Sequence, residues 1–154
     1  MKPDEMIAEL KLALPPAPKA AGLYKPVLML GDFVYFSGHL PILSGGSMIT
    51  GRVGTELSVE EGAAAARHVG LSVLSSLKEK LGSLNQISRV VKLLGMVNAP
   101  SSFSEHPKVI NGCSELFQEI WGEDFGVGVR SAFGVSGLPG SASVEIEGIF
   151  QLTQ

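Results

Sequence analysis

The chain has 154 residues, which is enough for one domain with a hydrophobic core and too few for two domains of ordinary size. Hydrophobic residues make up 45% of the chain and charged residues only 18%, so it carries less charged surface than a soluble monomer usually has. The net charge of −3 offers no basic footprint for nucleic acid, no apolar run approaches the length of a membrane span, and a single cysteine excludes an internal disulfide. We therefore expect a cytoplasmic protein without nucleic-acid or membrane partners.

The first 21 residues predict a short helix followed by a linker. Asp4 is suited to cap a helix that continues to about Leu14, because Pro15 and Pro16 stop it there. The proline-rich segment that follows predicts irregular backbone. We expect residues 1–21 to form this helix and linker, and residues 22–154 to form the domain.

Three short strands are predicted next. Two apolar runs, 27–30 and 33–37, are separated by Gly-Asp, which favours a tight hairpin. The residues Ser-Gly-His-Leu-Pro then end the second run, and a Gly-Gly turn leads to a third strand near Met48 to Thr50.

A long helix is predicted after this region. Ser58 and Glu61 have the spacing of a capping box, and Gly82 is suited to end the helix. The small residues Ala63 and Gly70 on its apolar stripe favour close packing on a sheet.

A strand and a second long helix follow. Residues 87–98 show little alternation, which predicts a central strand covered on both faces. Pro107 favours the start of a helix that ends at Trp121-Gly122, with Cys113 as a small core residue. Asn111 lies off the centre of its apolar stripe, so its side chain faces either a neighbouring chain or water.

The C-terminal stretch, residues 126–150, predicts two strands joined by a turn. A period of two places Arg130 among small residues on the first strand and puts Glu145 and Glu147 on one face of the second. An antiparallel pairing of the two strands would bring Arg130 near Glu145. Such a pair can be structural or can bind a carboxylate and a water, and structural pairs are the more frequent kind.

The order of elements predicts an α+β domain with a mixed six-stranded sheet and both main helices on one face. The runs FVYF and VVKLLGMV are apolar on both faces, whereas two helices can cover only one side of a sheet. We therefore expect neighbouring chains to bury the other side.

The C-terminal motifs also resemble a known family. The tripeptide RSA at Arg130, LP at Leu138 and VEIE at Val144 are similar to the signature of the Rid family, also called YjgF or endoribonuclease L-PSP. The spacing of fifteen residues from Arg130 to Glu145 is similar to that of the family as well. The resemblance spans about residues 22–150 and implies a chorismate-mutase-like fold and a homotrimer.

The resemblance also implies a function, the hydrolysis of reactive 2-imino or enamine acids to 2-keto acids and ammonia. In that function Arg130 would bind the substrate carboxylate and Glu145 would position or activate the attacking water. Sites would lie between subunits, with Arg130 and Glu145 from one chain and Tyr24 or Asn111 from its neighbour. Further contacts to the substrate would come from Tyr24, Ser37, the Gly38 amide and Asn111.

Two residues depart from the family pattern. Ala132 stands where many deaminase members have Cys, and His39 stands where many relatives have Gln. These departures leave open a trimer that binds small carboxylates without turnover or acts like a chaperone. An endoribonuclease is a further alternative, against which the acidic charge balance counts. No dinucleotide fingerprint and no zinc-ligand spacing among the three histidines is present, so no cofactor is expected.

Overall fold

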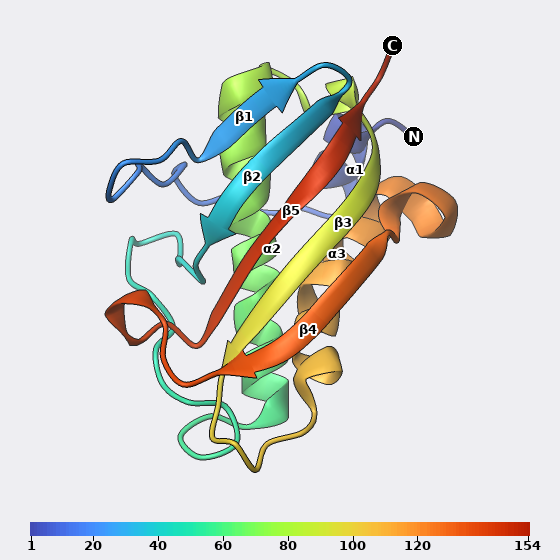
Figure 1. The fold of residues 1–154 in the computed structure, drawn as a ribbon. Coiled ribbons are helices and arrows are strands. Elements are labelled where there is room, and N and C mark those ends of the chain that lie inside the picture. The colour runs from blue at the N-terminus through green and yellow to red at the C-terminus, as the bar shows by residue number, and fades with distance from the viewer.

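The computed structural model describes residues 1–154 and contains one mixed sheet of five strands in the order β1-β2-β5-β3-β4 (Figure 1). Strands β3 and β4 are parallel, and all other neighbours are antiparallel. The strands are β1 (Val27–Leu30), β2 (Phe33–His39), β3 (Ile87–Asn98), β4 (Val129–Val135) and β5 (Val144–Leu152). The predicted α+β class is confirmed.

The predicted sixth strand is absent. Met48 makes an isolated bridge with Ile42, and Thr50 makes another with Ala142, but no ladder forms between them. The flanking Gly46 and Gly51 adopt φ values of 91° and 112°, and these left-handed turns interrupt the extended backbone. The sheet therefore has five strands, and the prediction of six was wrong.

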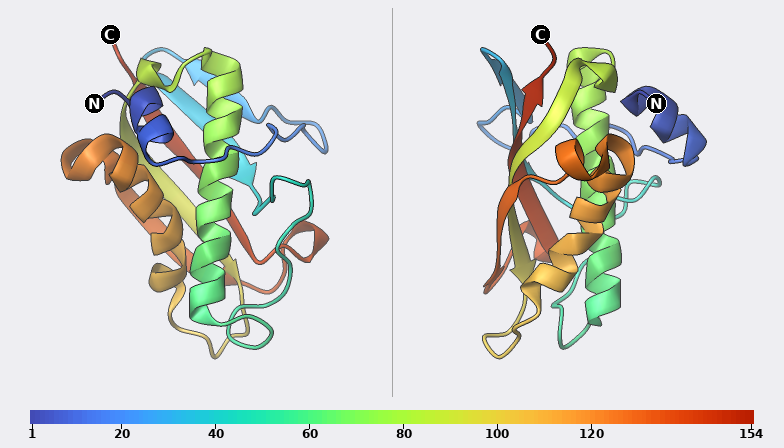
Figure 2. Two further views of the ribbon diagram at one scale, coloured as in Figure 1. Left: turned by 180° about the vertical axis from the view of Figure 1, so that it is seen from behind. Right: turned by 90° about the vertical axis from the view of Figure 1, so that its right-hand side faces the viewer.

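Both long helices cover the same face of the sheet, as predicted (Figure 2). A side view places α1 on the far side of these helices from the sheet. A break inside α3 at Gly122, with a φ of 81°, lies where the helix was predicted to end. The helices are α1 (Pro3–Glu9), α2 (Val59–Leu81) and α3 (His106–Gly126), with short 3-10 turns η1 (Leu84–Gln86) and η2 (Pro139–Ser141).

The ends of α2 form as the sequence predicts. The Ser58 hydroxyl accepts a hydrogen bond from the Glu61 amide, and the Glu61 carboxylate accepts one from the Ser58 amide. Gly82 ends the helix with a φ of 82°. The small residues of α2 have a different partner from the one predicted, because a side chain at Gly112 of α3 would collide with the Ala63 backbone. They serve the contact between the two helices at this point.

The N-terminal helix is shorter than predicted and is capped differently. It ends at Glu9, and its N-cap is Lys2. The Asp4 carboxylate instead accepts hydrogen bonds from the Ser83 hydroxyl at 2.6 Å and from the Leu84 amide at 3.3 Å. Asp4 thus ties α1 to the turn that follows α2.

The core lies between the sheet and the two long helices. Phe150 of β5 is fully buried and packs edge to face with Phe36, Phe117 and Trp121. Such aromatic pairs add roughly 0.5 to 1.5 kcal/mol each beyond the burial of their area. This cluster joins β2, β5 and α3 and so fixes these two strands against the helix.

The opposite face of the sheet, called the open face below, is apolar and uncovered in a single chain. On β1, β4 and β5 its side chains alternate with core residues, as a period of two requires, whereas register shifts interrupt the alternation in β2 and β3. Val129 is 68% exposed and Leu30 is 65% exposed. The other large apolar side chains exposed on this face are Leu28, Phe33, Tyr35 and Phe133.

Candidate active site

Arg130 lies on the edge strand β4 and points toward α3. Its partner in the parallel register is Leu93, a core residue, so the Arg130 side chain is on the helix side of the sheet. The guanidinium donates to the Ser114 hydroxyl at 2.9 Å, to the Asn111 side-chain oxygen at 2.7 Å and to the Pro107 carbonyl at 3.2 Å. We call Arg130, Asn111 and Ser114 the Arg130 cluster.

The Arg130 cluster borders a hollow of about 700 Å³ between α3 and the start of β4. The guanidinium is half-buried, and it is the one cation in the lining, which includes Glu115, Glu123 and Asp124. A small anion entering this hollow would be attracted to Arg130 and repelled by the acids around it. Ala132, half-buried on the same side of β4, brings no thiol to this region.

Glu145 lies on β5 and reaches across the open face toward β2. Its carboxylate occupies the space that a side chain at position 38 would need, so Gly38 is the residue that allows this approach. Burial raises the pKa of Glu145, and the neighbouring carboxylate of Glu147 raises that pKa further. A half-buried carboxylate whose pKa lies above its ordinary value is a stronger proton acceptor than an exposed one, so it is suited to general acid–base catalysis.

Ser37 and Tyr24 lie close to Gly38. The Ser37 hydroxyl donates to the carbonyl of Lys25, and the Tyr24 hydroxyl accepts a hydrogen bond from the Ala21 amide at 3.1 Å. Tyr24 and Gly38 both line a small cavity of about 170 Å³. We call Glu145, Gly38, Ser37 and Tyr24 the Glu145 cluster.

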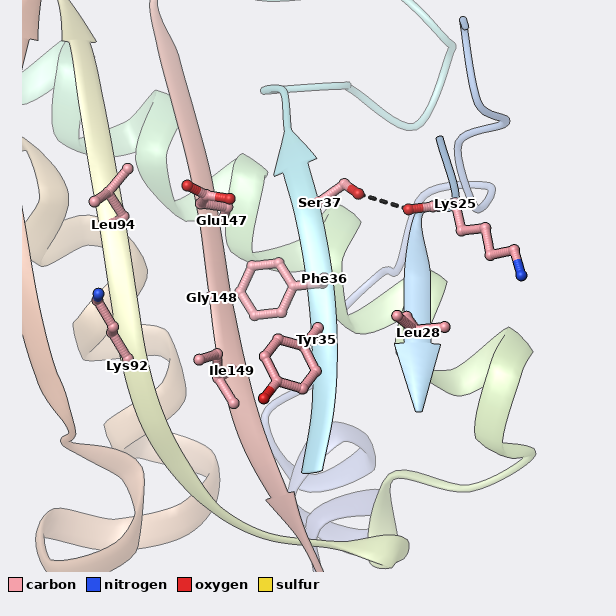
Figure 3. Close-up of a pocket in the computed structure, with 10 residues that line it drawn as sticks. All are labelled: Lys25, Leu28, Tyr35, Phe36, Ser37, Lys92, Leu94, Glu147, Gly148 and Ile149. Atoms are coloured by element: carbon pink, nitrogen blue, oxygen red, sulfur yellow. Dashed lines mark hydrogen bonds between the residues drawn. The ribbon is translucent and has the colours of Figure 1, made fainter. Parts of the chain in front are cut away.

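A second hollow, of about 510 Å³, extends the Glu145 cluster along the open face (Figure 3). Ser37 and Glu147 line one end of it, and Tyr35 and Ile149 line its centre. Lys92 of β3 supplies a positive charge at its other side. The hollow is open and partly apolar, so it belongs to the same uncovered surface as the exposed residues of β1 and β4.

The structure does not bring Arg130 and Glu145 together within one chain. Strand β3 lies between β4 and β5, so the predicted pairing of these two strands was wrong. Arg130 also faces the helices, whereas Glu145 faces away from them. The Asn111 side-chain oxygen accepts a hydrogen bond from Arg130 of its own chain, which counts against a neighbouring chain as the source of Asn111, whereas the alternative, Tyr24 from the neighbour, stays a prediction. A site that uses both clusters would need two chains.

The sequence did not predict a role for Ser114, and it left the role of His39 open. Ser114 follows Asn111 by three residues on α3, and that spacing places both side chains on one face of the helix. The spacing could have predicted Ser114 as a further partner of Arg130. His39 is only 3% exposed and binds Ser76 of α2, which the alternation of β2 did not indicate.

No group of three or more His, Cys, Asp or Glu side chains is arranged to hold a metal ion. Cys113 is fully buried, and burial raises the pKa of its thiol far above the ordinary value, so this residue is unsuited to act as a nucleophile. None of the helices has the length and apolar character needed to cross a membrane.

Comparison with known proteins places the chain in a family. Residues 5–139 match the model of the YjgF endoribonuclease-like family, described as YjgF/chorismate mutase-like. The chain belongs to the YjgF/chorismate mutase-like family. The family is the Rid family that the C-terminal motifs resemble, and the resemblance is confirmed.

Relatives within this YjgF/chorismate mutase-like family differ in how closely they match. Protein TCP17 of Trypanosoma cruzi is 39% identical over 146 residues, which cover 95% of this chain and 91% of that protein. The crystal structure of Atu1372 from Agrobacterium tumefaciens, a protein of unknown function, is 36% identical with a TM-score of 0.87, and the match covers 98% of this chain and 94% of that one. RidA from an Antarctic Psychrobacter is 29% identical with a TM-score of 0.60, covering 88% of this chain and 93% of that one. The fold is thus more similar to Atu1372 than to RidA, which indicates a divergent branch.

Proposed function

We propose that this protein hydrolyses reactive 2-imino acids, and their enamine tautomers, to 2-keto acids and ammonia. The observation that carries the proposal is the half-buried Glu145 carboxyl group with its raised pKa, beside a backbone bulge at Gly38. Membership of the Rid family supports the same chemistry.

In the proposed reaction the oxygen of a water bonds to C2 of the imine while Glu145 accepts a proton from that water. Glu145 then returns this proton to the nitrogen. The second proton of the water also reaches the nitrogen as the C2–N bond breaks, so that ammonia leaves and C2 keeps the oxygen as a keto group. Ala132 supplies no thiol that could transfer these protons. We therefore assign the proton transfer to Glu145.

The substrate carboxylate would bind Arg130. A guanidinium can offer two parallel hydrogen bonds to a carboxylate, and Asn111 and Ser114 hold this one in position. Three of its five N–H groups already donate to α3, and these include both N–H groups of Nη2. Because each parallel pair of donors needs one of these two, a two-pronged carboxylate would take the place of at least one present partner. The Pro107 carbonyl, at 3.2 Å, is the most distant of these partners.

The complete site would form between two chains of a homo-oligomer. One chain would supply the Arg130 cluster, and its neighbour would supply the Glu145 cluster. The apolar open face supports oligomerisation because a monomer would leave its large side chains in water. The number three is taken from the family resemblance.

The test is an assay of ammonia release. A 2-imino acid would be generated continuously by an amino-acid oxidase, and its conversion would be followed with and without the protein. We expect the protein to accelerate ammonia release, and we expect Glu145→Gln and Arg130→Ala each to abolish most of that acceleration. Release at the rate of the uncatalysed reaction would contradict the proposal.

A second candidate is a protein that binds small carboxylates without turnover. The absence of a thiol at Ala132 favours it. Calorimetric titration with 2-ketobutyrate beside the ammonia assay separates the two functions. Binding without any acceleration would support this second candidate.

A further inference from the structure

The backbone of β2 contains a bulge that turns His39 toward the helices. Strand β2 pairs with β5 first through Phe36 and Gly148 and next through His39 and Ile146. Three steps on β2 therefore match two steps on β5, and the extra residue belongs to the Ser37-Gly38 segment. Without it, simple alternation from the buried Phe36 would place His39 on the open face.

The ring of His39 is buried and uses both of its nitrogens. Nδ1 lies 2.6 Å from the carbonyl oxygen of Ser37, and Nε2 lies 2.8 Å from the hydroxyl oxygen of Ser76 on α2. A carbonyl oxygen can only accept, so Nδ1 carries the hydrogen and donates it. In the neutral ring Nε2 is then the acceptor, and the Ser76 hydroxyl donates to it.

The surroundings of the ring keep it neutral. Burial lowers the pKa of His39 and outweighs the hydrogen bond to the Ser37 carbonyl, which raises that pKa. The edge of the ring also packs against Phe36, with centroids 5.8 Å apart. His39 is therefore a fixed, uncharged link between the rigid helix α2 and the bulge.

The link has a direct effect on the Glu145 cluster. A trans peptide group is planar, and its C=O and N–H point in opposite directions. Holding the Ser37 carbonyl therefore sets the direction of the Gly38 N–H. Gly38 in turn lies against the Glu145 carboxylate, and no larger residue fits between them.

We propose that His39 is a positioning residue, which uses Ser76 on α2 as its anchor to hold the bulge so that the Gly38 amide and the Glu145 carboxylate face the substrate. The effect of this role on catalysis rests on the proposed function. Gln can donate one hydrogen bond and accept another through its side-chain amide, so it can make the same link. Leu fills a similar space but can make neither bond.

The test compares His39→Leu and His39→Gln with the wild type, with calorimetric titration of 2-ketobutyrate and kinetics of ammonia release. We expect His39→Leu to weaken 2-ketobutyrate binding by about tenfold or more and to lower kcat, because the direction of the Gly38 amide is lost. His39→Gln should restore both values to within about threefold of the wild type. A folded His39→Leu variant that binds and turns over like the wild type would overturn the proposal.

A pair of serine variants covers the case in which His39→Leu does not fold. Ser76→Ala removes the anchor, whereas Ser75→Ala removes a neighbouring buried hydroxyl that binds Pro15 and Leu71 and does not contact His39. We expect Ser76→Ala, and not Ser75→Ala, to weaken ligand binding. Equal effects of the two substitutions would overturn the proposal.

A ligand-free measurement separates this inference from the proposed function. In a nitrogen-15 NMR spectrum, the Gly38 amide signal should move in Ser76→Ala and His39→Leu and stay in place in Ser75→Ala. If the wild type binds no keto acid and releases no ammonia, the proposed function fails, and this signal still decides the positioning role. An unchanged Gly38 signal in Ser76→Ala and in every His39 variant would overturn it.

Discussion

Arg130 binds the substrate carboxylate in the proposed site. A substitution can test whether this binding depends on the planar guanidinium or on the charge alone. Arg130→Lys keeps the charge but loses the fork that offers two parallel hydrogen bonds. A charge-assisted hydrogen bond contributes roughly 1.5 to 3 kcal/mol, so we expect 2-ketobutyrate affinity to fall about ten- to a hundredfold in calorimetric titration.

Arg67→Lys is the matched control for this substitution. Arg67 makes a two-pronged contact with Glu119 on the exposed surface, away from both clusters, and such pairs contribute little to stability. We expect it to leave both affinity and melting temperature close to those of the wild type. If Arg130→Lys lowers the melting temperature and leaves affinity unchanged, Arg130 is a structural residue that holds α3 to β4.

We expect the ionised Glu145 carboxylate to support activity and to lower the stability of the folded protein. Because its pKa is raised in the folded state, the folded chain holds a proton that the unfolded chain releases between the ordinary pKa and the raised one. Stability from this group is therefore present below the ordinary pKa and is lost as the pH rises through the raised pKa. We expect Glu145→Gln to have a higher melting temperature than the wild type at pH 7, while ammonia release falls by a factor on the order of 10² to 10⁴.

Glu147→Gln provides the comparison, since Glu147 lies two residues along the same face of β5 and is more exposed. It should keep most of the activity, and thermal melts from pH 4 to pH 8 should follow those of the wild type more closely than those of Glu145→Gln. A Glu145→Gln variant less stable than the wild type at pH 7 would show that this carboxylate contributes to the fold.

At the scale of the elements, the bulge in β2 is the part of the site most sensitive to a single methyl group. Gly38→Ala would place its side chain on the Glu145 carboxylate, which must then move. We expect a folded protein with ammonia release reduced at least about tenfold, since displacement of a catalytic group by even 1 Å is costly. Gly45→Ala, where the added methyl meets open space, should behave like the wild type. Equal activity of the two variants would exclude Gly38 from the site.

The elements that depend on local signals were predictable. The capping box at Ser58, the glycine at the end of α2 and the hairpin between β1 and β2 were read from neighbouring residues and are confirmed. The sixth strand could not be predicted from local signals, because a strand needs a paired neighbour. The residues near Met48 form only isolated bridges.

Long-range pairing explains the larger error in the candidate site. The β4 and β5 strands follow one another in sequence, which favoured a hairpin, but β3 lies between them. Nothing within residues 126–150 encodes that insertion, since it depends on the pairing of β3 with both strands. The bulge at Ser37-Gly38 could not be predicted from the sequence either, and the burial of His39 depends on this bulge.

At the scale of the whole molecule, the open face predicts assembly. Phe133 on β4 is 40% exposed there, and a charge in its place would be buried without a partner in any assembly that covers this face. We expect Phe133→Glu to be monomeric and inactive in light scattering and ammonia assays, whereas the wild type forms an oligomer. Phe125→Glu changes an exposed phenylalanine near the end of α3, stacked on Arg89, and should keep the oligomer. A stable wild-type monomer at micromolar concentration would contradict this prediction.

The central claim is that each site combines Arg130 of one chain with Glu145 of another, and mixed oligomers test it most directly. Arg130→Ala and Glu145→Gln proteins, each inactive alone, would be mixed in equal amounts, unfolded and refolded together, and assayed for ammonia release. Random assembly pairs an intact Arg130 with an intact Glu145 in about a quarter of the sites of a symmetric ring. We therefore predict recovery of about a quarter of the activity of refolded wild type, whereas no recovery in a mixture shown to contain mixed oligomers would contradict a shared site.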